Sequence, residues 1–173
     1  MRVTSKTVII GVYAVLVVSC SINLVLSTFN YLHFYRAIER IDLLIVNFQW
    51  TLSDNELNLS GILVISNPER YSGLRIRVVY YEFWIINSSD PFQNYPIAAQ
   101  RSWFGTEKGI LLEPYSNITN TFTIIKELNE ETSEILQTLR KENELVWTVK
   151  GSAWLWAFLE EPIQIFFPQK IIE

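Results

Sequence analysis

The feature that most constrains this chain is a run of twenty residues without a charged side chain near its start. Residues 7–26 read TVIIGVYAVLVVSCSINLVL. As a helix this run would be about 30 Å long, which is the thickness of the hydrocarbon core of a bilayer. Aromatic residues then cluster before Arg36 and Arg40, as is typical where a helix leaves a membrane. We therefore expect residues 1–40 to form a cytoplasmic tail, a transmembrane helix and a juxtamembrane extension, with the lipid bilayer as a partner.

Two alternatives to an uncleaved anchor stay open. A cleaved signal peptide has a shorter apolar core, and no convincing small-x-small cleavage site ends this one. Residues 17–20, VVSC, resemble a bacterial lipobox, in which Cys20 would be lipidated after cleavage. Apolar residues continue past Cys20, however, and a processed lipoprotein would not need them. An uncleaved single-pass anchor is the preferred interpretation.

Basic residues predict the orientation of this anchor. Arg2 and Lys6 precede the apolar run without acidic neighbours, whereas Arg36 and Arg40 are interleaved with acidic residues. The positive-inside rule then places the N-terminus inside the cell and the C-terminal domain outside the cell membrane. Three Asn-x-Ser/Thr sequons agree with an exterior domain and are candidate glycosylation sites: Asn58, Asn87 and Asn117.

The composition argues against several classes of protein. One cysteine allows no intrachain disulfide, and one histidine argues against a His-based metal site. Of the 14 basic residues 12 follow the apolar run, together with all 18 acidic residues, so the outer part is mildly acidic. It has no basic footprint for nucleic acid and no glycine loop for phosphate. We expect no cofactor, no metal, no nucleic acid and no small-molecule substrate.

Residues 41–173 show short apolar or alternating runs between turn signals, a pattern that predicts antiparallel strands with short links. One helix is expected from Glu130 to about Lys141, capped by Asn129. The predicted strands are residues 41–52, 56–66, 73–86, 97–104, 117–125, 145–158 and 162–167. The expected fold class is mainly β: a transmembrane helix followed by an antiparallel β-sandwich of about seven strands with one short helix.

A turn motif follows the second of these strands. Residues 61–73 read GILVISNPERYSG. Pro68 has no N–H for a strand ladder, the Asn67 side chain can bond its own backbone, and Gly73 can take a positive φ. We interpret the three residues as a structural turn that ends one strand and starts the next.

The motif and its surroundings resemble a known family. The stretch LNLSGILVISNPERYSGLRIRVVYYEFWI, and later LLEPYSNITNTFTI and WTVKGSAWLWAFLEEPIQIFF, resemble the group 2 late embryogenesis abundant proteins, the water-stress and hypersensitive-response (WHy) domain family. The resemblance covers about residues 41–170. It implies a fibronectin-like β-sandwich, no enzymatic activity, an association with stress protection and frequent membrane tethering. The heavy aromatic content near the end of the chain departs from the family pattern.

That aromatic content marks a candidate interaction surface. Trp154, Trp156 and Phe158 share one face of a predicted strand, and the opposite face is also apolar. One face should fill the core, and the other must be covered by the helix, by lipid or by another protein. Two arginines of an earlier strand, Arg75 and Arg77, either bind an anionic partner or form a solvated strand face.

No catalytic group emerges from the sequence. His33 lies in the membrane-proximal segment, and the paired carboxylates suit a helix start and a solvated turn. We therefore expect a non-enzymatic single-pass membrane protein whose extracytoplasmic WHy-like domain acts in binding or scaffolding, or in stress protection of the envelope. The alternative is an accessory subunit of a larger membrane protein complex, with other membrane-protein subunits as partners.

Overall fold

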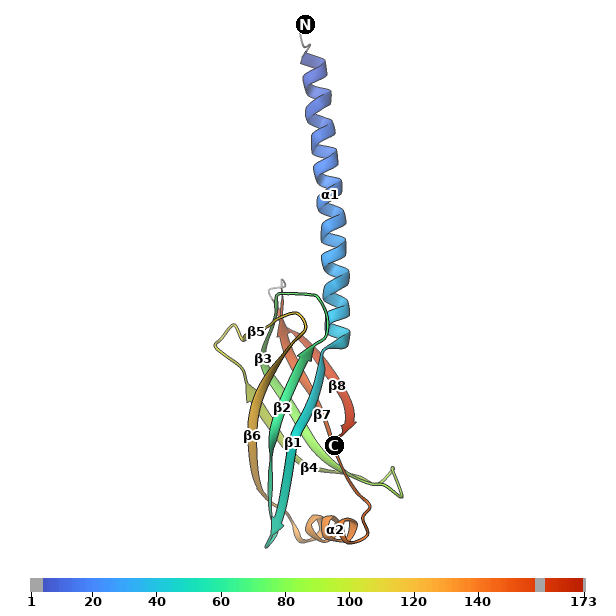
Figure 1. Ribbon diagram of the computed structural model, residues 1–173, viewed down its shortest axis with the longest axis vertical. Coiled ribbons are helices and arrows are strands. Elements are labelled where there is room, and N and C mark those ends of the chain that lie inside the picture. Colours follow the sequence, from blue (N-terminus) through green and yellow to red (C-terminus); the bar gives the residue numbers. More distant parts are fainter. Residues whose placement is uncertain (1–4, 158–160, 173) are drawn as a thin grey trace.

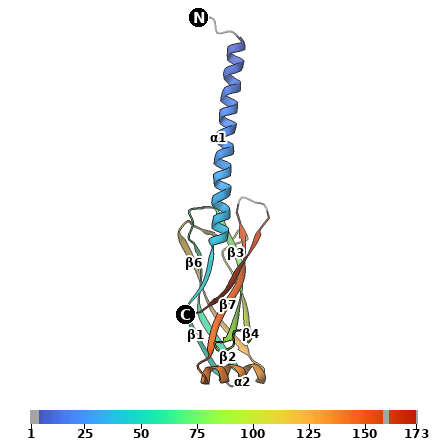
Figure 2. The ribbon, with the colours of Figure 1, turned by 90° about the vertical axis from the view of Figure 1, so that its right-hand side faces the viewer.

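The computed structural model describes residues 5–157 and 161–172. A long N-terminal helix, α1 (Ser5–Arg40), stands on one end of a β-sandwich (Figure 1). A second helix, α2 (Glu130–Lys141), lies across the opposite end in both views (Figures 1 and 2). The predicted fold class, mainly β with an apolar N-terminal helix and one further short helix, is confirmed.

Two antiparallel sheets form the sandwich. The three-stranded sheet has the order β1 (Asp42–Ser53), β2 (Glu56–Asn67), β6 (Ser116–Glu127). The five-stranded sheet has the order β4 (Asn94–Trp103), β3 (Leu74–Asn87), β7 (Leu145–Trp156), β8 (Ile163–Ile171), and β5 (Ile110–Leu112) pairs with β3 as well. The core lies between the two sheets, where apolar side chains from alternate strand positions meet.

Three details of the strands differ from the prediction. β5 has only three residues and pairs with the start of β3, in a segment where no strand was predicted. β4 starts before Pro96 and β8 continues past Pro168, whereas the predicted strands covered residues 97–104 and 162–167. Both strands lie at an edge of the sheet, where proline is tolerated because one side of the backbone has no neighbouring strand.

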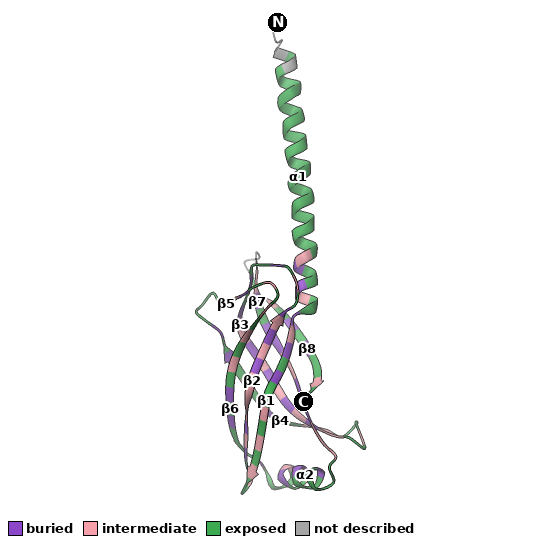
Figure 3. Cartoon of the chain, in the orientation of Figure 1, coloured by how far each residue is buried: buried purple, intermediate pink, exposed green. Residues whose placement is uncertain are grey.

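The apolar part of α1 is exposed along most of its length, as the colouring in Figure 3 shows. Of the helices in the described part of the chain, α1 is the one long and apolar enough to cross a bilayer. A secretory signal sequence near an N-terminus can meet the same criteria of length and hydropathy.

The last turns of α1 are packed into the sandwich. Phe34 and Ala37 are buried, and the Phe34 ring lies 5.5 Å from the ring of Tyr71 between their centroids. Arg40 forms an ion pair with Glu69, with 2.6 Å between Nη1 and Oε1. Tyr71 and Glu69 belong to the turn between β2 and β3, so α1 is attached to the domain at that turn.

Candidate binding surface

The structure decides which face of β7 points outward. Leu155 is buried, whereas Trp154 is 38% exposed on the outer face of the five-stranded sheet. Trp156 lies on the same outer face and is half-buried. Phe158, the third residue of the predicted interaction surface, lies outside the described residues. α2 packs at the far end of the molecule, so it does not cover these tryptophans (Figures 1 and 2).

A groove of about 560 Å³ crosses this outer face. We call it the tryptophan groove. It is lined by residues of four strands: Arg77, Val78, Tyr80, Arg101, Trp103, Ser152, Trp154, Trp156 and Gln164.

Strand register sets the shape of the groove. Val78 of β3 pairs with Trp103 on one side and with Trp154 on the other. Because neighbouring strands lie about 4.8 Å apart, the two tryptophans are separated by roughly 10 Å, with the smaller valine between them. A bulge in β3 between Ile76 and Val78 shifts the outward-facing positions from Arg75 and Arg77 to Val78 and Tyr80, so Arg77 and Val78 both line the groove.

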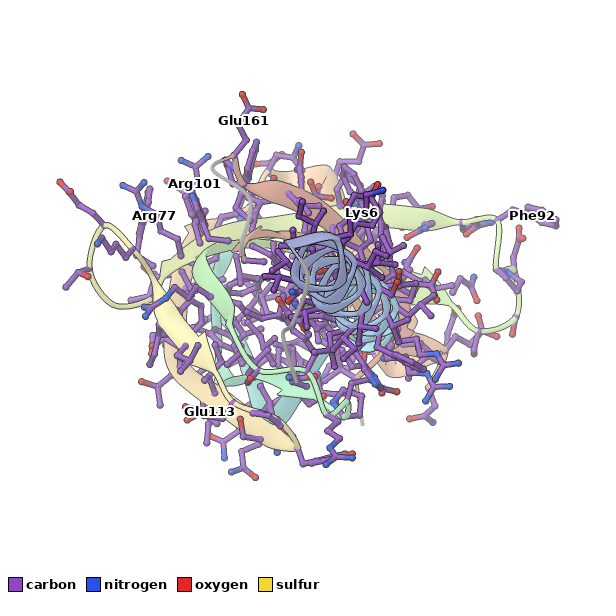
Figure 4. All side chains as sticks on the ribbon, turned by 90° about the horizontal axis from the view of Figure 1, so that it is seen from above. Lys6, Arg77, Phe92, Arg101, Glu113 and Glu161 are labelled. Atoms are coloured by element: carbon purple, nitrogen blue, oxygen red, sulfur yellow. The ribbon has the colours of Figure 1, made fainter. Side chains whose placement is uncertain are left out.

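Arg77 and Arg101 give the groove its charge. The guanidinium carbon of Arg77 lies 5.8 Å from the ring centroids of both Trp103 and Trp156. Figure 4 shows Arg77 and Arg101 on the same side of the domain, and both line the groove. No Asp or Glu lines it, and within residues 5–157 and 161–172 neither arginine takes part in an ion pair.

Beside the groove, on the same face of the sheet, hydrogen bonds and an ion pair form a polar network around Glu82. Glu82 accepts hydrogen bonds from the Tyr80 hydroxyl at 2.9 Å and from the Trp84 indole at 3.0 Å, and it pairs with Lys150 at 3.3 Å. The Lys150 ammonium lies 3.8 Å from the centroid of the Trp84 ring. Burial raises the pKa of Glu82, but these hydrogen bonds and the Lys150 charge outweigh it, so the net pKa is lowered. The positive charge of Lys150 is therefore already paired with the Glu82 carboxylate.

Of the groove residues, only Arg77, Trp154 and Trp156 were named from the sequence, so Arg101 and Trp103 are among those that were missed. Their exposure alternates with the buried Ser102, which is the two-residue period of a strand with one solvated face. The sequence itself does not show this alternation, because the buried residue is a serine and one of the exposed residues is a tryptophan. The closeness of Arg101 and Trp103 to Trp154 could not be read from the sequence, because it depends on both β4 and β7 pairing with β3.

Of the predicted turn residues, Asn67 ends β2, and Pro68 and Gly73 lie between β2 and β3. Asn67 is 1% exposed, and its side-chain oxygen accepts a hydrogen bond from the Glu69 N–H at 3.1 Å. Gly73 has a φ of +104°. Pro68 follows the last residue of β2. Along the chain, Arg77 of the tryptophan groove follows Gly73 by four residues.

The candidate glycosylation sites occupy three different environments. Asn117 is exposed on β6, at an edge of its sheet, whereas Asn58 is half-buried on the central strand β2. Asn87 ends β3, and its side-chain oxygen accepts hydrogen bonds from the N–H groups of Ser89 at 2.8 Å and Asp90 at 3.3 Å. Of the three side chains, that of Asn117 is the most open to solvent.

The described residues contain no group of three or more His, Cys, Asp or Glu side chains that could hold a metal ion. His33 is half-buried on α1, at the end where the helix meets the domain. Glu130 and Glu131 lie in the first turn of α2, whose N-cap Asn129 accepts a hydrogen bond from the Thr132 N–H at 2.8 Å.

The tryptophan groove offers aromatic rings and guanidinium groups, which are suited to recognising a ligand.

Comparisons with known proteins leave the family open. No family model matches the chain, and no curated protein matches it. A solved structure of the putative ApaA protein from Bordetella pertussis is similar over 76% of this chain and 93% of its own, at 10% identity and a TM-score of 0.42. A protein from Archaeoglobus fulgidus is similar over 76% of this chain and 96% of its own, at 13% identity and a TM-score of 0.42.

Proposed function

We propose that this protein is a non-enzymatic, single-pass membrane protein whose exterior domain binds a partner protein through the tryptophan groove. The observation that carries the proposal is the position of Trp154, Trp156 and Trp103 on an outer sheet face that no other element covers in the described part of the chain. Tryptophan and arginine are enriched at protein interfaces and dominate their binding energies. This supports the role of an accessory subunit in a membrane protein complex.

The membrane anchor in this proposal is α1. Its apolar side chains are exposed from Val8 to Leu32, and lipid would cover them in a bilayer. The helix continues without a break into residues that pack in the sandwich core, so a cleavage site at the end of the apolar run would fall inside a helix. The positive-inside rule supports an orientation with the domain outside the cell.

Stress protection of the envelope, which the resemblance to the WHy family implies, stays a prediction. The groove supports binding rather than a general protective role, because its residues converge on one site.

Co-purification in a mild detergent tests the proposed function. The full chain should be recovered with stoichiometric protein partners, and Trp154→Ser should release them while the thermal unfolding midpoint stays the same. Phe92→Ser is the matched control, since Phe92 is 97% exposed on the loop between β3 and β4 and lies far from Arg77 and Arg101 in Figure 4. Recovery of the wild-type chain as a lone monomer would contradict the proposal.

A further inference from the structure

We infer that the tryptophan groove binds an extended, carboxylate-bearing segment of a second membrane-anchored protein, close to where that segment leaves the bilayer. This inference rests on the proposed function and names the chemistry and position of the partner. Three properties of the groove carry it: its unmatched charge, its width and its fixed height above the membrane.

The positive charge of the groove favours an anionic ligand. Arg77 and Arg101 both line the groove, and within residues 5–157 and 161–172 no acidic residue does. Elsewhere on the same face, Lys150 forms an ion pair with Glu82. The two arginines differ from Lys150, because neither forms an ion pair within that part of the chain. Glu161, which lies on the same side of the domain in Figure 4, points away from both arginines. A guanidinium group binds carboxylates through paired, charge-assisted hydrogen bonds.

The two tryptophan rings hold Arg77 in place. Its guanidinium carbon lies at the same 5.8 Å from the Trp103 and Trp156 rings, so contacts from two sides restrict its position. A restrained side chain loses less conformational freedom when it binds. Arg77 is therefore preorganised for binding, whereas a fully solvated arginine would lose more conformational entropy when a ligand orders it.

The width of the groove selects an extended chain. Trp103 and Trp154 lie on either side of Val78, roughly 10 Å apart by two strand spacings. A helix with its side chains is about 10–12 Å across and would not enter between the two rings. An extended chain, which occupies about 4.8 Å in a sheet, fits over the valine with side chains against the tryptophans. At the groove wall the Gln164 amide donates one hydrogen bond to Ser152, and the Tyr80 hydroxyl donates to Glu82. Among the residues that the structure describes, this leaves the Gln164 side-chain carbonyl oxygen and second N–H and the Tyr80 hydroxyl oxygen for a ligand.

The junction with α1 fixes the height of the groove. Phe34 and Ala37 are buried in the domain and Arg40 pairs with Glu69, so the helix and the sandwich are joined without a flexible linker. If the charge-free run ends at the edge of the hydrocarbon core, the eight residues from Leu26 to Phe34 add about 12 Å of helix beyond that edge.

Strand β3 then carries the groove further from the membrane. The three residues from Leu74 to Arg77 add about 10 Å of strand, which puts Arg77 about 20 Å beyond the hydrocarbon edge. The headgroup layer is only about 5–8 Å thick, so lipid phosphates do not reach the groove. A protein segment that has just left the bilayer does reach it, which favours a membrane-anchored partner over an anionic lipid.

Site-directed photocrosslinking of the full chain in native membranes tests this inference. Gln164→p-benzoylphenylalanine places the probe in the groove without removing an arginine or a tryptophan. We expect an adduct with another membrane protein. The crosslinked segment should contain at least two Asp or Glu residues. It should lie within about twenty residues of that protein's membrane span, which is about the number of residues in one span. Adducts only with lipid, with a second copy of this chain or with segments lacking acidic residues would overturn the inference.

Charge variants give the second arm of the experiment. In the crosslinking chain, Arg101→Gln should reduce the adduct yield at least five-fold, and the Arg77→Gln/Arg101→Gln pair should reduce it further. Lys150→Gln is the matched control and should change the yield less than two-fold. Circular dichroism of each variant should match the parent, and Arg101→Gln is the decisive variant because Arg101 is an exposed edge-strand residue.

The two proposals can fail separately. If Trp154→Ser releases the partner but the arginine variants keep the full adduct yield, the groove binds a partner without using its charge, and only this inference is wrong. If the partner is retained in Trp154→Ser, the groove is not the docking surface and the proposed function is wrong as well.

Discussion

The side-chain amide of Asn67 donates a hydrogen bond to the main-chain carbonyl of Glu113, at 3.3 Å, across 46 positions of the chain. The same amide donates to the carbonyl of Tyr71 at 3.1 Å, and the side-chain oxygen accepts from Glu69. One buried side chain thus connects the turn after β2 to the segment after β5. The turn also receives α1, through Tyr71 and Glu69.

We therefore predict that Asn67→Ala lowers the free energy of unfolding by about 2–4 kcal/mol, because it leaves buried carbonyls and an N–H without their partner. Urea titration of the detergent-solubilised chain measures this difference. Asn117→Ala, at an exposed position of β6, is the control and should change the free energy by less than about 0.5 kcal/mol. Equal effects of the two substitutions would show that the turn bonds contribute little.

The two tryptophans at opposite ends of β7 should respond differently to truncation. Trp147 is 6% exposed and its ring contacts those of Phe48 and Trp50, so Trp147→Ala should cost about 3–5 kcal/mol of folding stability. Trp154→Ala should cost less than about 1 kcal/mol, because its ring lies on the solvated face. Thermal unfolding of both variants decides this, and a large loss for Trp154→Ala would mean that its ring stabilises the sheet itself.

Gly151 should not tolerate a side chain. A Cβ at this position would lie 2.4 Å from the carbonyl oxygen of Tyr80 on the neighbouring strand, at the bulge between β7 and β8. We predict that Gly151→Ala destabilises the domain by about 2–3 kcal/mol, since the β3 backbone must move. Gly11→Ala, where a Cβ meets no atom within 4 Å, is the matched substitution and should leave the urea midpoint unchanged.

Glu82 should make stability depend on pH. Its pKa in the folded domain lies below the ordinary value of 4.5, so its ionised form stabilises the fold above pH 4.5 and this contribution is lost as pH falls through the folded pKa. Glu82→Gln should therefore be less stable than the wild type at pH 7, and the difference should shrink below pH 4.5. Thermal unfolding between pH 7 and pH 3 measures the gap, and a constant gap would show that the carboxylate does not titrate as described.

The membrane anchor can be tested by intact mass. An uncleaved chain has a mass of 20.2 kDa, and the membrane fraction should contain this species if α1 is the anchor. A shorter chain that begins at Cys20 and carries a lipid would identify a lipoprotein instead. A shorter soluble chain would identify a secretory signal sequence.

Local signals in the sequence were sufficient for most elements of the fold. The apolar run predicted α1, the Asn129 cap predicted the start of α2, and Asn67-Pro68 predicted the end of β2. Each of these features is set by residues within one or two turns of chain, where helix capping, hydrophobic periodicity and proline geometry act. The prediction was wrong where the neighbourhood of a strand mattered, as at Pro96 and Pro168 on the edge strands.

Three of the nine groove residues were visible in the sequence. The alternation in residues 145–158 showed that Trp154 and Trp156 share a face, and the strand around Arg77 showed an outward-facing basic residue. The choice of the exposed face of β7 needed the tertiary structure, because both faces are apolar and only packing against the three-stranded sheet distinguishes them. The bulge after Ile76, which turns Val78 outward between the two tryptophans, is also a property of the pairing between β3 and β7.

The amino-acid sequence alone thus determines that an apolar helix precedes an antiparallel sandwich with a turn at Asn67-Pro68, since helix length, strand period and proline chemistry are local. The tertiary structure decides that Trp103 and Trp154 lie on either side of Val78 with two arginines beside them. Strand pairing joins residues as far apart as Arg75 and Trp156 by backbone hydrogen bonds, which are nearly independent of side-chain identity. A groove made across four strands is therefore defined only when the register of all four is known.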